Sequence, residues 1–240
     1  MGVRTVGHVV TIDALQAEVD ARFDRLGLPG WPDPHAGRPD RSPAEDEYSR
    51  LTNPGRHVVV HERARVWAQV LGERLGARVD RLPPEPLRPV DNHLLGFHRG
   101  VRVTSARPGT VPLLLLERDM RDDPGDDEPL PVLVVAVVRS DLLLASWPDC
   151  GCDACDCGSA DLLEALDQSV REIVGGPCVV LQGEGWGAQW VPDGGRAHST
   201  GPQRRYDFRA LMEVCRRMAA GEDVVPPDGA RAFVGRSWLE

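Results

Sequence analysis

The chain has 240 residues, 41% of them hydrophobic, and a formal net charge of -9 at pH 7. A chain of this size can bury one sizeable core, and its negative field disfavours binding to nucleic acid and to anionic lipid. No segment approaches the roughly 18 consecutive apolar residues that span a bilayer, and residues 1–10 are too short an apolar run for a signal peptide. We therefore expect a single cytoplasmic domain over residues 1–240, with neither nucleic acid nor a membrane as partner.

The first third of the chain alternates helical and proline-rich segments. Residues 11–26 predict a helix that Thr11 caps, because apolar residues recur on one of its faces. Residues 28–41 contain four prolines and predict a loop. Ser42-Pro43-Ala44-Glu45 has the pattern of a capping box that opens a short helix, and a longer helix is expected over residues 56–75, ended by a glycine.

Two histidines lie four residues apart on the long predicted helix. Metal ligands on a helix take this spacing, but zinc-protease chemistry needs a glutamate base where this chain has Val58. The interpretation that His57 and His61 are packing or surface residues is therefore favoured over a role as ligands.

The hydrophobic period changes to two in the middle of the chain, which predicts strands. Residues 101–106 and 110–118 predict a hairpin around a Pro-Gly turn. Residues 130–138 and 142–147 predict a second hairpin, whose near-continuous valine and leucine content indicates central strands buried on both faces. The acidic residues 119–128 lack the register of a calcium loop and predict a solvated turn.

The last third returns to helices and strands. A helix capped by Ser159 is expected to end at residue 175, followed by a strand from Cys178. Residues 183–188 formally fit a dinucleotide-binding glycine loop, but no helix can follow them, so a glycine turn between two strands is favoured. A final helix over residues 208–220, burying Phe208, Leu211, Met212 and Cys215, and an apolar tail that docks on the body complete the chain.

The order of these elements indicates an α+β fold. We expect a mostly antiparallel sheet of about six strands, with four or five helices packed chiefly on one face. Serine, histidine and acidic residues do not occur at a spacing that assembles a nucleophile, a base and an orienting acid, so no catalytic residue is predicted. A function other than catalysis is favoured.

Residues 148–159 carry the most specific chemistry, because they hold four of the six cysteines: Cys150, Cys152, Cys155 and Cys157. In a reducing compartment such a cluster indicates a metal site or redox chemistry rather than disulfides. Zinc usually takes four ligands from two separated segments. Since all four thiols lie within eight residues, we predict a zinc site made of three of them plus a more distant ligand. Candidates for that ligand are His57, His61, His93, His198 and Cys178.

Three aspartates are interleaved with the cysteines: Asp149, Asp153 and Asp156. Negative charge raises the pKa of a nearby thiol, which argues against a reactive nucleophile and favours a divalent cation. The dipole of the following helix is expected to lower the pKa of Cys157 and Cys155. Inert cysteines are the second interpretation, and the C-x-x-C spacing of Cys152 and Cys155 leaves a redox dithiol as the alternative chemistry.

The motif Pro148-Asp149-Cys150-Gly151-Cys152-Asp153-Ala154-Cys155-Asp156 is distinctive. Together with further segments it makes the chain resemble, over nearly its whole length, an uncharacterised actinobacterial family of unknown function. Those segments are residues 47–50, 53–56, 185–190 and 233–238. The resemblance implies serine in relatives at the position of Cys157, which makes Cys150, Cys152 and Cys155 the favoured ligands. It implies no activity and no substrate.

Two functions follow as hypotheses. The first is a cytoplasmic metal-binding protein in which the cysteines hold a structural zinc ion that fixes the loop to the following helix. The second is a noncatalytic module whose acidic surface binds and neutralises a basic protein partner, with the cysteines incidental.

Overall fold

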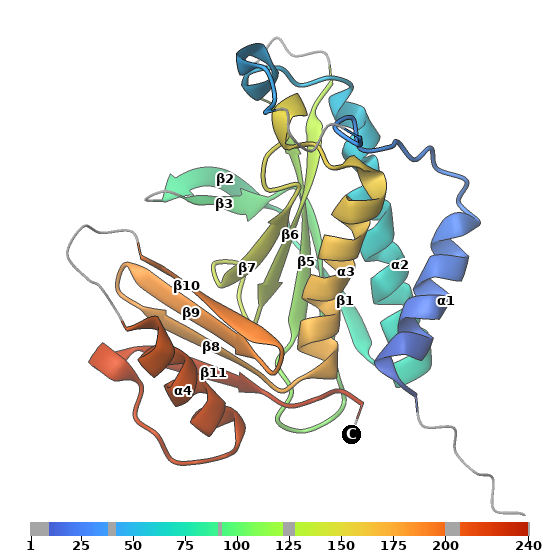
Figure 1. The fold of residues 1–240 in the computed structure, drawn as a ribbon. Helices are drawn as coiled ribbons and strands as arrows, with labels where there is room; N and C mark the ends of the chain where they lie inside the picture. The colour runs from blue at the N-terminus through green and yellow to red at the C-terminus, as the bar shows by residue number, and fades with distance from the viewer. Residues whose placement is uncertain (1–9, 38–41, 91–92, 122–127, 200–206, 240) are drawn as a thin grey trace, which may run out of the picture.

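The computed structural model describes residues 10–37, 42–90, 93–121, 128–199 and 207–239 (Figure 1). Its α-helices are α1 (Ile12–Asp24), α2 (Val58–Leu75), α3 (Gly158–Gly175) and α4 (Phe208–Ala219). Short 3-10 helices are η1 (Glu45–Tyr48), η2 (Pro54–His57), η3 (Asp153–Cys155) and η4 (Pro227–Gly229). The strands are β1 (Arg78–Leu82), β2 (Glu85–Val90), β3 (His93–Phe97), β4 (Arg99–Thr104), β5 (Leu113–Met120), β6 (Leu130–Val137), β7 (Leu143–Trp147), β8 (Cys178–Gly183), β9 (Trp186–Val191), β10 (Gly194–Ser199) and β11 (Arg231–Gly235).

The described strands form two main antiparallel sheets and a hairpin, which confirms the α+β class. The first sheet has the order β1-β4-β5-β6-β7, the second has the order β10-β9-β8-β11, and β2 pairs with β3. The expectation of one sheet of about six strands is wrong. After β7 the chain runs through the cysteine loop and the length of α3, and β8 then starts a new sheet with β9 and β11.

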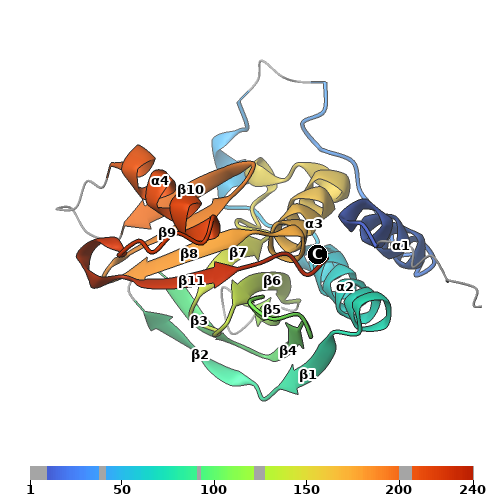
Figure 2. The same ribbon diagram turned by 90° about the horizontal axis from the view of Figure 1, so that it is seen from below.

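The helices divide between the two sheets. Helices α2 and α3 lie against the first sheet and α1 packs on them, whereas α4 covers the second sheet (Figures 1 and 2). The expectation that the helices pack chiefly on one face therefore holds for the first three only. Within the described residues, no helix is both long and apolar enough to cross a membrane.

Strands β5 and β6 are the buried centre of the first sheet. Their inner face lies under the helices, and their outer face packs with Phe97 in a second cluster that includes Leu116 and Val134. The first hairpin and the pairing of β6 with β7 are as predicted. The expectation that β7 is central is wrong, since β7 is the edge strand and is only half-buried.

Several end signals act as the sequence predicts. The Thr11 hydroxyl accepts from the Ala14 amide at the start of α1, and α2 ends at Gly76 in the left-handed conformation with φ 63°. The capping box predicted at residues 42–45 is wrong: the N-cap of the 3-10 turn η1 is Ala44, whose amide donates to Glu47, and no α-helix follows there within the described residues 45–57. Helix α3 begins one residue before Ser159, whose side chain has a different partner, described below.

The C-terminal third also follows most of the predictions. Strands β8 and β9 form a hairpin around the glycine turn, and the tail adds β11 to β8 and buries Trp238. The expected burial of Phe208 is wrong, because this residue is exposed at the start of α4. Of the acidic turn at residues 119–128, residues 122–127 lie outside the described residues.

A buried charged cluster joins the three helices of the first layer. Asp167 on α3 accepts from Arg63 Nε at 2.9 Å, from Trp67 Nε1 at 2.6 Å and from Gln16 Nε2 at 2.8 Å. A second guanidinium nitrogen of Arg63 bonds to Asp167 and to Asp20 on α1. One carboxylate thus fixes the positions of α1, α2 and α3 relative to one another, and with them the start of α3 where the cysteine loop ends.

Candidate metal centre

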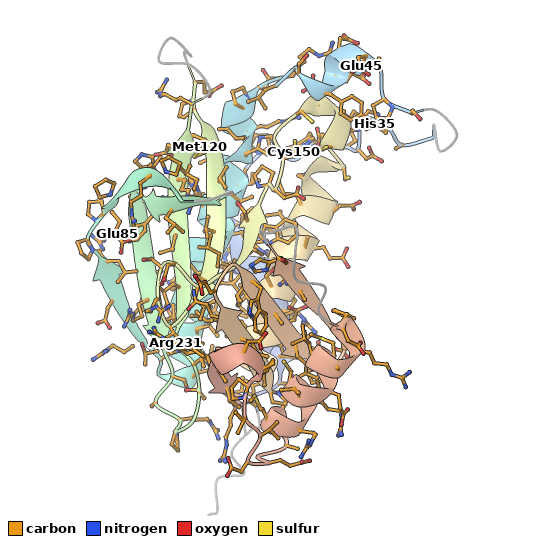
Figure 3. All side chains as sticks on the ribbon, turned by 90° about the vertical axis from the view of Figure 1, so that its left-hand side faces the viewer. His35, Glu45, Glu85, Met120, Cys150 and Arg231 are labelled. Carbon is orange, nitrogen blue, oxygen red and sulfur yellow. The ribbon has the colours of Figure 1, made fainter. Side chains whose placement is uncertain are left out.

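The cysteine loop connects β7 to α3 and lies at the same end of the molecule as His35 and η1 (Figure 3). The sulfurs of Cys150, Cys152 and Cys155 all lie within 4.8 Å of one another, and those of Cys150 and Cys152 are 3.2 Å apart. The turn η3 brings Cys155 back toward the first two thiols. Sulfurs bound to one tetrahedral zinc ion at about 2.3 Å lie about 3.8 Å apart, so small side-chain movements would fit these three to one ion.

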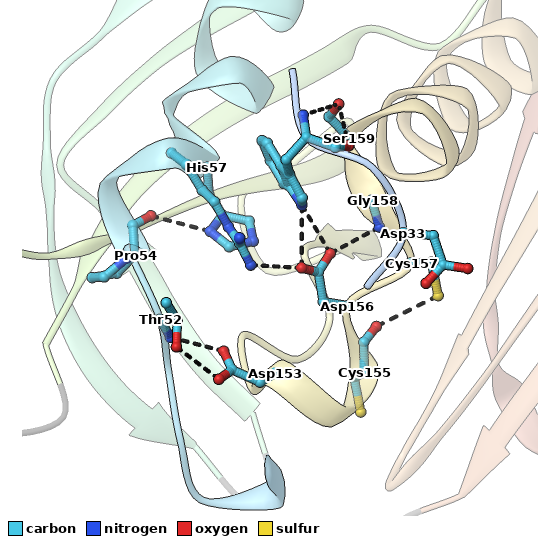
Figure 4. Close-up of polar contacts among 12 residues, drawn as sticks. Asp33, Thr52, Pro54, His57, Asp153, Cys155, Asp156, Cys157, Gly158 and Ser159 are labelled. Atoms are coloured by element: carbon cyan, nitrogen blue, oxygen red, sulfur yellow. Dashed lines mark hydrogen bonds and ion pairs between the residues drawn. The ribbon is translucent and has the colours of Figure 1, made fainter. Parts of the chain in front are cut away.

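Cys157 lies outside this group of three. It is the N-cap residue of α3, and its thiol donates to the Cys155 carbonyl oxygen at 3.5 Å. Figure 4 shows the Cys155 sulfur pointing away from Cys157. The structure therefore brings together three of the four predicted cysteines.

Asp153 holds the middle of the loop. Its carboxylate accepts from Arg50 Nε at 2.6 Å, from the Thr52 amide at 2.8 Å and from the Thr52 hydroxyl at 2.7 Å. Its backbone amide donates to the Arg50 carbonyl at 2.8 Å, and its carbonyl lies 3.1 Å from His35 Nε2. The carboxylate of Asp153 is thus bound to Arg50 and Thr52, and Figure 4 shows its two contacts with Thr52.

Asp156 holds the end of the loop in the same way. Its carboxylate accepts from Trp31 Nε1 at 3.0 Å, from Arg56 at 2.6 Å and from the Gly158 amide at 2.8 Å. The Arg56 guanidinium lies 4.7 Å from the centre of the Trp31 ring, and His57 meets the same ring edge-on at 5.2 Å. This carboxylate is buried and its charge is balanced by Arg56.

Residues 28–37 and 42–57, here called the N-terminal arm, therefore form a second layer around the cysteine loop. Ser159 belongs to this contact, because its hydroxyl accepts from the Trp31 amide at 3.0 Å and its own amide donates to the Trp31 carbonyl. The expected role of Ser159 as the helix cap is wrong. Sequence reasoning also missed the arm, since Trp31, Arg50 and Arg56 become neighbours of the cysteines only through tertiary folding.

A cavity of about 250 Å³ lies beside the thiols. Cys150, Cys152, Cys155 and Cys157 line it. The remaining wall combines apolar groups, the carboxylates Asp149, Asp156 and Asp161, and the ring of His57. Neither Asp149 nor Asp161 forms an ion pair with any described residue, unlike Asp153 and Asp156.

The thiols differ in their tendency to ionise. Hydrogen bonds with Cys152 and Cys150 raise the pKa of Cys155 to about 12. Burial opposes ionisation of Cys152, but hydrogen bonds from Cys150 and Cys155 outweigh it and lower the pKa of this thiol. Burial also raises the pKa of Cys157, and four negative charges raise it further: Asp33, Asp161, Asp156 and Asp149. The aspartates therefore act on Cys157 as expected, and the pKa of both Cys157 and Cys155 lies above its usual value, opposite to the direction of the helix dipole.

The more distant ligand candidates have other partners. His57 Nδ1 lies 3.1 Å from the Pro54 carbonyl oxygen, and His61 Nε2 lies 3.0 Å from that of Val132. Cys178 is buried in the main core, and His198 is on β10 of the second sheet. The His93 side chain lies outside the description. The two helix histidines are thus packing residues, as the missing glutamate indicated.

Burial lowers the pKa of both His57 and His61 below the usual 6.5. At His61 the negative charges of Glu117 and Asp119 act in the opposite direction but do not outweigh burial. Below pH 6.5 the unfolded chain takes up protons that the folded chain does not, so the free energy of unfolding falls as the pH falls. Each histidine contributes a slope of at most about 1.4 kcal/mol per pH unit. Urea unfolding between pH 7.5 and 5.5 is expected to show a shallower slope for His61→Gln than for the unaltered chain. Equal slopes in the two chains would contradict a lowered pKa of His61 in the folded state.

Residues 18–240 match a family described as a family of unknown function, DUF6226. The chain belongs to this family. The match covers α1 from residue 18 onward, the whole cysteine loop, the arm that holds it and both sheets, so the site described above lies inside the family's region. No curated protein and no solved structure matches the chain. Membership in DUF6226 brings no activity with it, and the function has to be argued from the site.

Proposed function

We propose that this member of DUF6226 binds one zinc ion through the thiolates of Cys150, Cys152 and Cys155. The observation that carries the proposal is the approach of these sulfurs to within 4.8 Å of one another on a loop that the arm already holds in place. Asp153 and Asp156 provide that hold through Arg50, Thr52, Trp31 and Arg56. A preorganised loop loses little conformational entropy when it binds an ion.

The donor set supports zinc rather than a hard cation. Calcium and magnesium take oxygen ligands, and the two carboxylates nearest to the middle of the loop are bound by Arg50 and Arg56 instead. Thiolates select soft or borderline ions, of which zinc is one that stays in a single oxidation state. The ion would tie Cys150, at the end of β7, to Cys155, at the start of the turn into α3. Its role in this proposal is structural.

The test is metal content and affinity in three full-length chains purified without a histidine tag. The unaltered chain and Cys157→Ser are expected to bind one equivalent of zinc, and Cys152→Ser is expected to bind it at least 100-fold more weakly. At a free zinc concentration of 100 times the Kd, binding should stabilise the first two chains by about 2.7 kcal/mol. Chelator competition and thermal unfolding measure both quantities.

Two results would overturn the proposal. The unaltered chain could bind no stoichiometric zinc, with all its exposed thiols titrating freely. Alternatively, Cys157→Ser could lose as much affinity as Cys152→Ser, which would show that Cys157 is an equal ligand and that three thiolates do not form the site.

The acidic interaction module stays a prediction. Its basis is the net charge of -9, and its partner would be a basic protein. The cytoplasmic location likewise stays a prediction. A pulldown that returns no stoichiometric partner would count against this second function.

A further inference from the structure

We infer that an ion at Cys150, Cys152 and Cys155 keeps its fourth coordination position open toward the neighbouring cavity, and that this position takes a small thiol carrying a positive charge. The inference rests on the proposed zinc site and names the ligand class of that same site.

No described neighbouring side chain is placed as a fourth ligand: Asp149, Asp161 and His57 line the cavity but do not belong to the group of close ligand atoms. Among the described residues, the group of close ligand atoms contains the three sulfurs and no fourth atom. Asp153 and Asp156 are bound by the arm. His57 contacts the Pro54 carbonyl and the Trp31 ring, and Cys157 donates to a backbone carbonyl. A tetrahedral ion held by three ligands leaves one position for an external ligand.

The cavity gives that external ligand room. Its volume of about 250 Å³ exceeds the roughly 30 Å³ of one water molecule several times over. Trp147, Leu162 and Ala165 supply an apolar wall that suits a short methylene chain. The three thiols belong to the same lining, so one molecule in the cavity can reach the ion while its chain contacts apolar side chains.

Charge selects the ligand. A divalent ion with three thiolates carries a net charge of -1, and Asp149 and Asp161 add further negative charge to the lining without an ion pair among the described residues. An anionic molecule is therefore disfavoured, whereas an ammonium group is favoured. A fourth sulfur completes a common zinc ligand set. On binding, the thiol would replace a water molecule on the ion, and its proton would pass to the solvent.

The experiment compares cysteamine and 3-mercaptopropionate, two thiols that share a two-methylene spacer and carry opposite charges. The full-length chain is loaded with cobalt(II), whose near-ultraviolet thiolate bands report the three protein ligands and whose visible bands report the fourth position. Cysteamine is expected to change the visible bands with a Kd at least tenfold lower than that of 3-mercaptopropionate. In the double variant Asp149→Asn, Asp161→Asn the ratio should fall to threefold or less.

The matched control is Glu164→Gln, an exposed carboxylate on α3 outside the cavity lining, which should leave the ratio unchanged. Visible bands that respond to neither thiol would overturn the inference while the near-ultraviolet bands still support the metal site. A response seen only after Cys157→Ser would overturn it as well, because Cys157 would then fill the fourth position. Equal affinities for the two thiols would reject the charged ligand. Absence of the near-ultraviolet bands would reject the proposed function and this inference together.

Discussion

Replacing Asp167 by alanine is expected to lower the free energy of unfolding by about 3–5 kcal/mol, the range for breaking a buried ion pair by removing one partner. Asp167 accepts from Arg63, Trp67 and Gln16, so its loss leaves a buried guanidinium with only the exposed Asp20 and leaves the indole nitrogen unpaired. Urea unfolding at pH 7 measures the change. Because α1, α2 and α3 share this carboxylate, the loss should appear in one cooperative transition.

A second pair of variants separates the charge from the packing. The double variant Arg63→Met, Asp167→Leu removes both charges and should recover part of the lost stability, since hydrophobic replacement of a buried pair is often neutral. The rest is not recovered, because the buried Trp67 indole nitrogen stays unpaired. Glu164→Ala removes an exposed carboxylate from the same helix and should change stability by less than about 0.5 kcal/mol. If Asp167→Ala lowers the free energy of unfolding no more than Glu164→Ala does, the buried cluster does not hold the helices together.

Replacing Gly158 by alanine is expected to detach the N-terminal arm from the start of α3. Gly158 has φ 86°, and an added Cβ would lie 2.6 Å from the backbone nitrogen of Asp33 and 2.9 Å from the carbonyl carbon of Pro32. The strained backbone alone costs about 1–3 kcal/mol, and the overlap requires the arm to move. Since the arm holds Asp156, zinc affinity should fall at least tenfold together with the stability.

The same helix supplies the control. Gly175, the last residue of α3, has open space around its Cβ position, so Gly175→Ala should be neutral or slightly stabilising. Unfolding in urea and chelator competition compare the two variants. Unchanged zinc affinity in Gly158→Ala, despite lowered stability, would show that the arm does not position the loop.

Local patterns predicted much of the secondary structure, because their signals lie within a few residues of one another. Thr11 and Gly76 mark helix ends through their own hydrogen bonding and conformation, and the alternating residues around the Pro-Gly turn form the first hairpin. The strands β1, β2 and β3 lie in the proline-rich residues 77–100 and were not predicted, because prolines argue against strands. Strand β2 can carry prolines because it belongs to a two-stranded hairpin, which tolerates missing amide donors.

The split into two sheets had no local signal. Strand β8 has the valines of a buried strand whichever sheet it joins, and only its pairing with β9 and β11 places it in the second sheet. The same holds for β7, whose leucines suit a central strand although it forms an edge. Partner choice among strands depends on contacts between residues far apart in the chain.

The sequence by itself determined where the candidate metal site of this protein lies. Cysteine density and spacing identified the loop, and the resemblance to relatives favoured Cys150, Cys152 and Cys155, the same three whose sulfurs meet. Only the tertiary structure decided what the aspartates do. Asp153 and Asp156 bind side chains about 100 residues earlier in the chain, among them Arg50 and Arg56. From the sequence, a carboxylate next to a thiol is expected to act on the pKa of that thiol. The direction in which the carboxylate points, and the group that it binds, depend on the packing of distant segments.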